Sequence, residues 1–300
     1  MDPAPHRGGV RARGGGPVSL LERVPPVWLV LTAIVSLQVG AAIAKDGFAL
    51  VGPLVFVLLR LATSAVVLLA VAGPRLTGRH RGDWLVVLGY GVCLAGMNVA
   101  IYQAFARIPL GMAVTIEFLG PLAVAVLGSR RPRDLVWVGL AGVGVALLGF
   151  DPTGLDPVGV GFAVLAALFW AGYILLGART ARRWEGVSGL AVASLFGVLL
   201  AGAPGLLEGG ALLLDPRVLA LGLAVGVLSS VLPYSLELTA LRRMPPRVFG
   251  VLMSLEPAAA ALAALVLLGE RLTGAQWLAL GCVVVASVGA TRAPRAVPDG

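Results

Sequence analysis

Long uninterrupted apolar segments dominate this sequence. Runs of roughly 16 to 25 apolar residues recur along the chain, and about 20 such residues in a helix are needed to cross the hydrocarbon core of a bilayer. The charged residues gather in the short segments between the runs, and they make up only 13% of the chain, whereas soluble domains carry about 25%. The sequence therefore predicts an all-α integral membrane protein.

Ten of these runs are predicted to be transmembrane helices, because a helix satisfies its own backbone hydrogen bonds in lipid. The predicted spans are 27–44, 51–72, 84–104, 110–128, 134–150, 158–178, 187–207, 217–241, 247–268 and 274–291. Residues 1–26 are rich in Arg, Gly and Pro and are predicted to form a disordered basic segment. Residues 292–300 are predicted to form a short tail.

Basic residues are divided unevenly between the two sides of the predicted bundle. With a cytoplasmic N-terminus, eighteen of the 23 basic residues fall on cytoplasmic segments, four fall on the opposite side and one, Arg60, lies within a span. The four on the opposite side are Lys45, Arg107, Arg217 and Arg271. Because an excess of Lys and Arg marks the cytoplasmic side, both termini are predicted to be cytoplasmic. The same distribution explains the net charge of +8 without nucleic acid.

The second half of the chain resembles the first in the order of its motifs. The segment 115–117 (Thr-Ile-Glu) has a counterpart at 254–256 (Ser-Leu-Glu), and 137–149 has a counterpart at 277–289. These correspondences predict two repeats, 27–150 and 151–291. Five spans per repeat is an odd number, so the second repeat is expected to have the opposite orientation. Inverted repeats recur in secondary transporters, whose binding site lies at the repeat interface near the midplane.

Two glutamates are predicted to lie inside the bilayer at equivalent positions of the repeats. A charged side chain at the bilayer centre costs roughly 2.5–3.5 kcal/mol, so Glu117 and Glu256 each need a reason to be there. Pro121 has no N–H to donate to the carbonyl of Glu117, and Pro257 has none for Met253. Each carboxylate is thus expected beside unpaired backbone acceptors. Such a position suits an ammonium group or a proton, although a structural hydrogen bond to a neighbouring helix is the alternative.

Arg60 is the basic residue predicted at depth in the membrane. It keeps its proton, so it needs an acceptor or water. Two interpretations remain open, a structural ion pair with Glu117 or Glu256 and a clamp for a substrate carboxylate. Further polar residues in the spans suggest a hydrated cavity, namely Gln38, Asn98, Tyr102, Gln103, Ser230, Tyr234, Ser235 and Ser254. Glu237 is predicted to be interfacial, and Trp170 is the tryptophan placed deep in a span.

Several classes of function are disfavoured by what the sequence lacks. There is no G-x-x-x-x-G-K-[ST] phosphate loop, and the single Lys is Lys45, so ATP hydrolysis on this chain is excluded. No metal-ligand cluster and no nucleophile–base arrangement is visible, and no cofactor is expected. A non-transporting scaffold or an intramembrane enzyme is the alternative from a different class. A secondary transporter is favoured.

Several motifs resemble those of the EamA family in the drug/metabolite transporter superfamily. They are Gly96-Met-Asn98, Pro109-Leu-Gly111, Glu117-Phe-Leu-Gly-Pro121, Ser129-Arg-Arg-Pro132, Leu232-Pro-Tyr-Ser-Leu-Glu237 and Leu252-Met-Ser-Leu-Glu-Pro257. The resemblance extends from about Trp28 to Gly289. It implies ten helices in two repeats, an inner-membrane location and efflux of small amino acids or related metabolites.

In the wider family the central cavity is lined chiefly by helices 3, 4, 8 and 9. In this sequence those helices carry Asn98, Tyr102, Glu117, Tyr234 and Glu256. Together with Gln38 and Arg60, these residues form the predicted binding set. The working hypothesis is a proton-coupled exporter of small neutral amino acids such as threonine and homoserine. Transport of another metabolite or a drug is the alternative within the same class.

Overall fold

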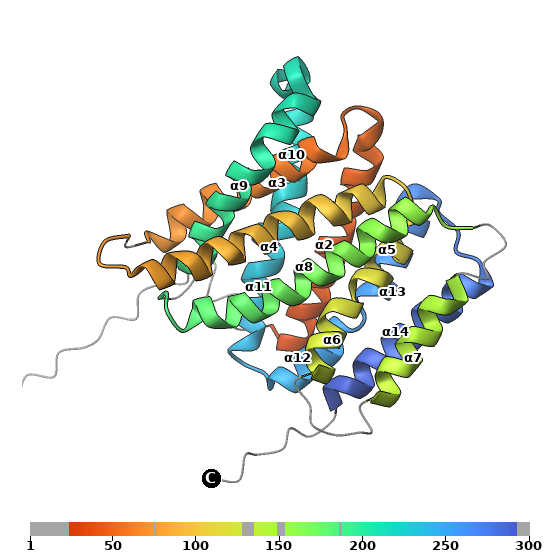
Figure 1. The fold of residues 1–300 in the computed structure, drawn as a ribbon. Coiled ribbons are helices and arrows are strands. Elements are labelled where there is room, and N and C mark those ends of the chain that lie inside the picture. The colour runs from red at the N-terminus through yellow and green to blue at the C-terminus, as the bar shows by residue number, and fades with distance from the viewer. Residues whose placement is uncertain (1–23, 75, 128–134, 149–153, 186–187, 293–300) are drawn as a thin grey trace, which may run out of the picture.

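A computed structural model describes residues 24–74, 76–127, 135–148, 154–185 and 188–292. Every regular element in these residues is helical, so the prediction of an all-helical protein is confirmed. The segments 1–26 and 292–300, predicted to flank the spans, lie outside the described residues except for Val24, Pro25, Pro26 and Arg292. Figure 1 shows the helices gathered into one bundle.

The helices follow the apolar runs closely. In chain order they are α2 (Pro26–Asp46), the 3-10 turn η1 (Gly47–Ala49), α3 (Pro53–Ala72), α4 (Arg81–Phe105), α5 (Leu110–Glu117), α6 (Leu119–Leu127), α7 (Leu135–Leu148), α8 (Pro157–Ala181), α9 (Ser188–Gly209), the 3-10 turn η3 (Gly210–Leu214), α10 (Pro216–Gly226), the π-helical turn η4 (Val227–Val231), α11 (Leu232–Leu241), α12 (Pro246–Met253), α13 (Glu256–Ala263), the π-helical turn η5 (Ala264–Leu268) and α14 (Gly274–Arg292). Five of these helices begin with proline, which cannot donate a backbone N–H and suits the first helical position.

Among the described residues, eight helical segments are long and apolar enough to cross a membrane. They coincide with the predicted spans other than the fifth and the tenth. Those two runs hold shorter apolar helices, Leu135–Gly144 within α7 and Gly274–Ala290 within α14.

Three predicted spans are interrupted helices, and proline explains each interruption. The span 110–128 is divided at Phe118 into α5 and α6, three residues before Pro121. The span 247–268 is divided at Ser254 and Leu255 into α12 and α13, just before Pro257. The span 217–241 contains η4, just before Pro233. Proline withholds one N–H from the preceding turn, and the helix responds by breaking or by widening into a π turn.

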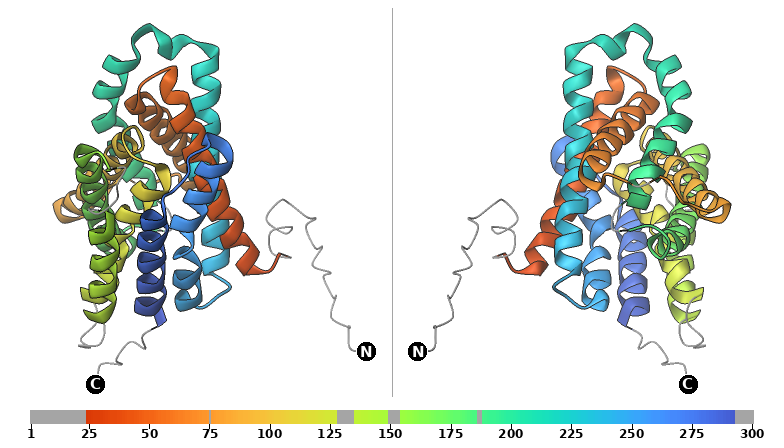
Figure 2. Two further views of the ribbon diagram at one scale, coloured as in Figure 1. Left: turned by 90° about the vertical axis from the view of Figure 1, so that its right-hand side faces the viewer. Right: turned by 90° about the vertical axis from the view of Figure 1, so that its left-hand side faces the viewer.

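The helices pack in a ring of neighbouring pairs. The helix α4 packs against α8 and α9, α3 packs against α9 and α10, and α2 packs against α11 and α13. The short helix α5 lies between α8 and α13. At one edge of the bundle α7 packs against α14, as Figures 1 and 2 both show.

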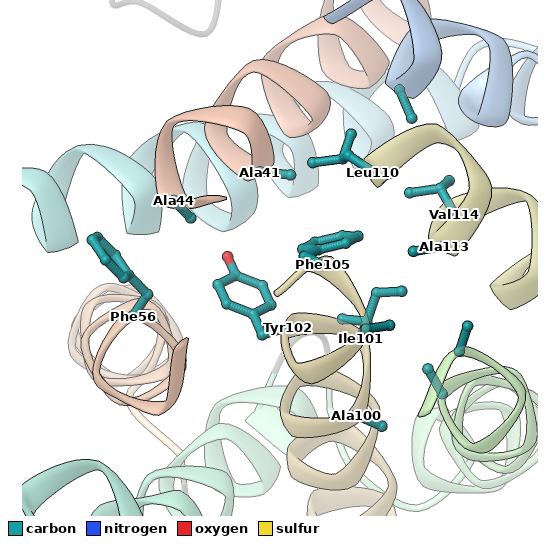
Figure 3. Close-up of a cluster of buried hydrophobic side chains, with 14 of the residues drawn as sticks. Ala41, Ala44, Phe56, Ala100, Ile101, Tyr102, Phe105, Leu110, Ala113 and Val114 are labelled. Atoms are coloured by element: carbon teal, nitrogen blue, oxygen red, sulfur yellow. The ribbon is translucent and has the colours of Figure 1, made fainter. Parts of the chain in front are cut away.

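The main apolar core lies toward one end of the bundle. This is the end that carries the α2–α3, α4–α5 and η5–α14 connections, and we call it the α4–α5 end. Figure 3 shows Phe56, Tyr102 and Phe105 meeting there beside Leu110. The rings of Tyr102 and Phe105 have centroids 5.5 Å apart. This core fills the interior of the bundle at the α4–α5 end.

Candidate functional site

A cavity of about 70 Å³ lies inside the bundle, next to the apolar core. It is lined by side chains of α2, α3, α4, α5, α8 and α13, which are Leu37, Gln38, Ala41, Arg60, Met97, Asn98, Ile101, Phe105, Val114, Glu117, Trp170 and Glu256. Pockets for drug-sized ligands measure about 300–1,000 Å³, whereas one water needs only about 10–15 Å³ of comparable space. The cavity therefore suits a few waters or a small polar solute.

Five of the seven side chains predicted to form a site line this cavity. They are Gln38, Arg60, Asn98, Glu117 and Glu256. The cavity does not include Tyr102 or Tyr234 in its lining. Tyr102 is fully buried behind Arg60, with the guanidinium carbon 5.8 Å from the centre of its ring. Tyr234 is half-buried on α11.

Glu256 occupies the first position of α13 and faces Gln38 on α2. The amide Nε2 of Gln38 donates to Oε1 of Glu256 at 3.1 Å. Oε2 of Glu256 and Oε1 of Gln38 are both buried and have no hydrogen-bond partner among the described residues. Buried acceptors of this kind are costly when left unpaired. These two oxygen atoms can therefore accept hydrogen bonds from a donor that enters the cavity.

Arg60 is anchored by the backbone and side chain of η4. Its Nη2 donates to the carbonyl oxygen of Ser229 at 3.0 Å, and its Nε donates to Oγ of Ser230 at 3.2 Å. Within the described residues, Arg60 forms no direct ion pair with Glu117 or Glu256, and its hydrogen-bond partners are serine groups of η4. The guanidinium faces the cavity with its charge uncancelled by a contacting carboxylate.

The π turn supplies the acceptors that hold Arg60 and α2. Pro233 has no N–H, so it cannot donate to Ser229 in an α-helical register or to Leu228 in a π register. The carbonyl of Ser229 accepts from Arg60, and that of Leu228 accepts from Oγ of Ser36 at 2.7 Å. Sequence reasoning considered Pro121 and Pro257 in this way but omitted Pro233, which was the signal for this anchor.

Glu117 and Asn98 form the opposite side of the cavity. Glu117 is the last residue of α5 and exposes only 8% of its surface, while Arg60 exposes 9% and Glu256 exposes 4%. The amide of Asn98 donates to the carbonyl of Leu94 at 2.8 Å, which leaves its Oδ1 buried and unpaired within the described residues. One guanidinium, two carboxyl groups and two amides thus surround a very small space. Such a set can bind a small solute that carries both a positive and a negative group.

The chain has close relatives over nearly its whole length. It is 45% identical over 276 residues to the threonine/homoserine exporter RhtA of Escherichia coli strain K12, covering 90% of this chain and 93% of the relative. It is 44% identical over 281 residues to the threonine/homoserine exporter RhtA of Salmonella typhimurium strain LT2, covering 91% and 95%. The pattern of the EamA-like transporter family matches residues 157–292.

The chain belongs to the EamA-like transporter family. A solved crystal structure of another protein covers 92% of this chain and 99% of its own chain, with 21% identity and a TM-score of 0.59. At that identity the likeness concerns the fold alone.

In this EamA-like transporter, sequence reasoning missed the apolar part of the site. Trp170 was identified as a tryptophan deep in a span, but not as a cavity residue. Its ring packs edge-on against Phe118 with centroids 5.4 Å apart, so the break between α5 and α6 is covered by an indole. Met97 and Val114 also line the cavity and look like ordinary core residues in sequence. Only the packing of α4, α5 and α8 against one another distinguishes them.

Proposed function

We propose that this EamA-like transporter is a secondary-active exporter of small neutral amino acids, first of all threonine and homoserine. Its relatives at 45% and 44% identity carry the name threonine/homoserine exporter. The observation that carries the proposal is the set of charged groups in the cavity. An amino acid is a zwitterion, and the cavity offers Arg60 to a carboxylate and Glu117 or Glu256 to an ammonium group.

The small size of the cavity favours a small substrate. Its volume of about 70 Å³ leaves little room for a long side chain, and its apolar wall includes Met97, Val114 and Trp170. A methyl or methylene group of threonine or homoserine packs on such a wall. The substrate hydroxyl can donate a hydrogen bond to Oδ1 of Asn98, which has no other partner among the described residues. Export of another metabolite or a drug is the alternative, and it requires a larger cavity in another conformation.

The proposed architecture is ten membrane helices in two inverted repeats, 27–150 and 151–291. Exchange of the halves relates α2 to α8, α3 to α9, α4 to α10 and α11, α5 to α12, α6 to α13, and α7 to α14. The packing supports this exchange. The α4–α8 pair corresponds to the pairing of α2 with α10 and α11, and the pairing of α8 with α5 and α6 corresponds to that of α2 with α12 and α13. The pairs α3–α9 and α7–α14 correspond to themselves, as expected for helices beside a two-fold axis.

The glutamates follow the same exchange. Glu117 ends α5 and Glu256 begins α13, and both lie at a break in an interrupted helix. Because α5 packs directly against α13, the two carboxyl groups face one cavity. Interrupted helices at the repeat interface are a common place for substrate and coupling ions in secondary transporters. We assign proton exchange or ammonium binding to these two glutamates, with the cavity exposed alternately to each side.

The proposed location is the cytoplasmic membrane with both termini inside the cell. The distribution of Arg supports this orientation. Arg183 and Arg243 are exposed, and Arg79 is half-buried, at the end opposite Lys45 and the α4–α5 connection. In this orientation the α4–α5 end faces the outside.

The proposal is tested by the tolerance of cells that lack other amino-acid exporters. Cells with and without the gene are challenged with a panel of amino acids and drugs. Increased tolerance to threonine and homoserine, with lower internal concentrations of both, is expected. Tolerance to drugs alone supports the alternative substrate. Unchanged tolerance and internal concentration across the panel contradict export and favour a scaffold or an enzyme.

A further inference from the structure

A second set of charged groups lies at the α4–α5 end, outside the cavity. Nζ of Lys45 is 2.5 Å from Oε1 of Glu270, and it also donates to the carbonyl oxygen of Ile108 at 2.7 Å. Oε2 of Glu270 accepts from the backbone N–H of Leu110 at 2.8 Å. We call these four groups the outer clamp. They are the Lys45 and Glu270 side chains, the Ile108 carbonyl and the Leu110 amide.

The outer clamp connects the two proposed repeats. Lys45 lies in the last turn of α2, Ile108 lies two residues before α5, and Leu110 begins α5, all in the first repeat. Glu270 lies in the connection between η5 and α14, in the second repeat. Pro109, at the N-cap position of α5, provides no side-chain hydrogen bond, so the distant Glu270 carboxylate caps this helix instead. A negative group is also favourable at a helix N-terminus.

The clamp lies beside a close backbone contact between the repeats. A Cβ atom at Gly111 would lie 2.9 Å from the Cα of Ala261, so α5 and α13 approach each other at backbone distance. The apolar core with Phe56, Tyr102 and Phe105 fills the same end of the bundle. On the other side of the cavity, Tyr173, Tyr234 and Glu237 are each half-buried. The apolar core and the α5–α13 contact make the α4–α5 end tightly packed, and we call it the closed end.

We propose that the outer clamp is the gate at the closed end, and that it must separate before the cavity can open toward the α4–α5 end. The inference rests on the proposed transport function. All eight residues of α5 are buried. At 1.5 Å per residue, about 10 Å of rigid helix separates Leu110 at the clamp from Glu117 in the cavity. The break at Phe118 is the hinge about which α5 turns when the clamp releases it.

The clamp has the chemistry of a reversible contact. The side chains of Lys45 and Glu270 keep 17% and 19% of their surface exposed, so water can replace each partner when the pair separates. A fully buried ion pair would be much more costly to separate. The neighbouring apolar core has no charge of its own. Removing the clamp charge should therefore shift the balance toward opening at this end without dismantling the core.

The gate is tested by labelling a cysteine in the cavity. Cys93 and Cys282 are replaced by alanine, and Ala41→Cys places the reporter thiol in the cavity wall. Membrane-impermeant maleimide is applied to vesicles of each orientation. Leu50→Cys and Thr77→Cys, both exposed, identify which side carries the α4–α5 end.

Two variants, Lys45→Met and Glu270→Gln, each remove the ion pair. Residue 270 keeps a side-chain oxygen in both variants, and this oxygen can still accept the hydrogen bond from the Leu110 N–H. Asp83→Asn removes the Asp83–Arg183 pair, 3.3 Å long, at the opposite end as the matched control.

Each clamp variant should raise the labelling rate from the α4–α5 side by about tenfold, and Asp83→Asn should leave it unchanged. Rates that stay within about twofold of the parent in both clamp variants would overturn the gate. If one clamp variant is not found in the membrane, the other still tests the gate, because each substitution alone removes the ion pair. Threonine efflux by the wild type is measured in the same vesicles. If the clamp variants do not raise labelling but the wild type exports threonine, the gate is refuted and the proposed function stands. If the clamp variants raise labelling but the wild type does not export threonine, the proposed substrate is refuted and the gate stands.

Discussion

Nη2 of Arg60 on α3 donates to the carbonyl oxygen of Ser229 on η4 at 3.0 Å. That oxygen is available because Pro233 supplies no N–H to the turn before it. A residue of the first proposed repeat is therefore held by a backbone irregularity of the second. The guanidinium keeps its full charge for the cavity, since serine groups, not carboxylates, are its acceptors.

Pro233→Ala should weaken export while leaving the protein folded. Alanine supplies an N–H that competes with Arg60 and Ser36 for the carbonyls of Ser229 and Leu228. A hydrogen bond to a charged group contributes about 1.5–3 kcal/mol, so the efflux rate should fall by roughly tenfold or more. Stability should not fall, because proline inside a helix is itself unfavourable by about 3 kcal/mol.

Pro204→Ala is the matched control for this variant. Pro204 also lies inside a helix, α9, but it does not line the cavity. Its replacement should leave efflux unchanged. Equal efflux by the two variants would show that the π turn does not position Arg60.

Gln38→Leu should reduce both stability and export. The variant removes the donor to Oε1 of Glu256 and leaves both oxygens of that buried carboxyl without a protein partner. An unsatisfied buried group costs about 1–3 kcal/mol, which should lower the Tm in detergent and slow efflux. Gln103→Leu is the control, because Gln103 bonds to Arg107 away from the cavity. If the two leucine variants behaved alike, the Gln38–Glu256 bond would have no special role.

Gly111→Ala should destabilise the repeat interface. The added Cβ would meet the backbone of Ala261 at 2.9 Å, and a backbone atom cannot turn aside as a flexible side chain can. Overpacking of this kind costs about 1–3 kcal/mol and should lower the Tm. In contrast, a Cβ at Gly202 of α9 meets nothing within 4 Å. Gly202→Ala should therefore keep or raise the Tm, and a Tm for Gly111→Ala at or above the parent value would argue against the close approach.

The positions of the helices were predictable because hydropathy alone sets them in a membrane protein. The predicted span 84–104 agrees with α4 within three residues at its start and one at its end. The prolines also predicted unpaired carbonyls beside Glu117 and Glu256, since a missing N–H is a local property, but the helix breaks at those positions were not predicted. The π turn at Val227–Val231 was not anticipated, because its register also depends on the side chains of Ser36 and Arg60 on other helices.

The candidate site was only partly predictable from the sequence. Polar residues inside apolar spans are rare enough to stand out, and Gln38, Asn98 and Glu117 were identified in that way. Their partners were not, because pairing depends on how α2, α3 and α13 pack. Hence Gln38 pairs with Glu256, while Arg60 donates to Ser229 and Ser230. Tyr234 satisfied the same polarity criterion, yet it is not among the residues that line the cavity.

The central claim is that the protein transports small amino acids across the membrane, and that Glu117 and Glu256 bind the substrate ammonium group or exchange a proton in one shared cavity. The most direct test is the flux of radiolabelled threonine through purified protein in liposomes under an imposed proton gradient. Gradient-dependent threonine flux is predicted for the wild type, with at least about a tenfold loss in both Glu117→Gln and Glu256→Gln. Full gradient-dependent flux by both glutamine variants would contradict the account.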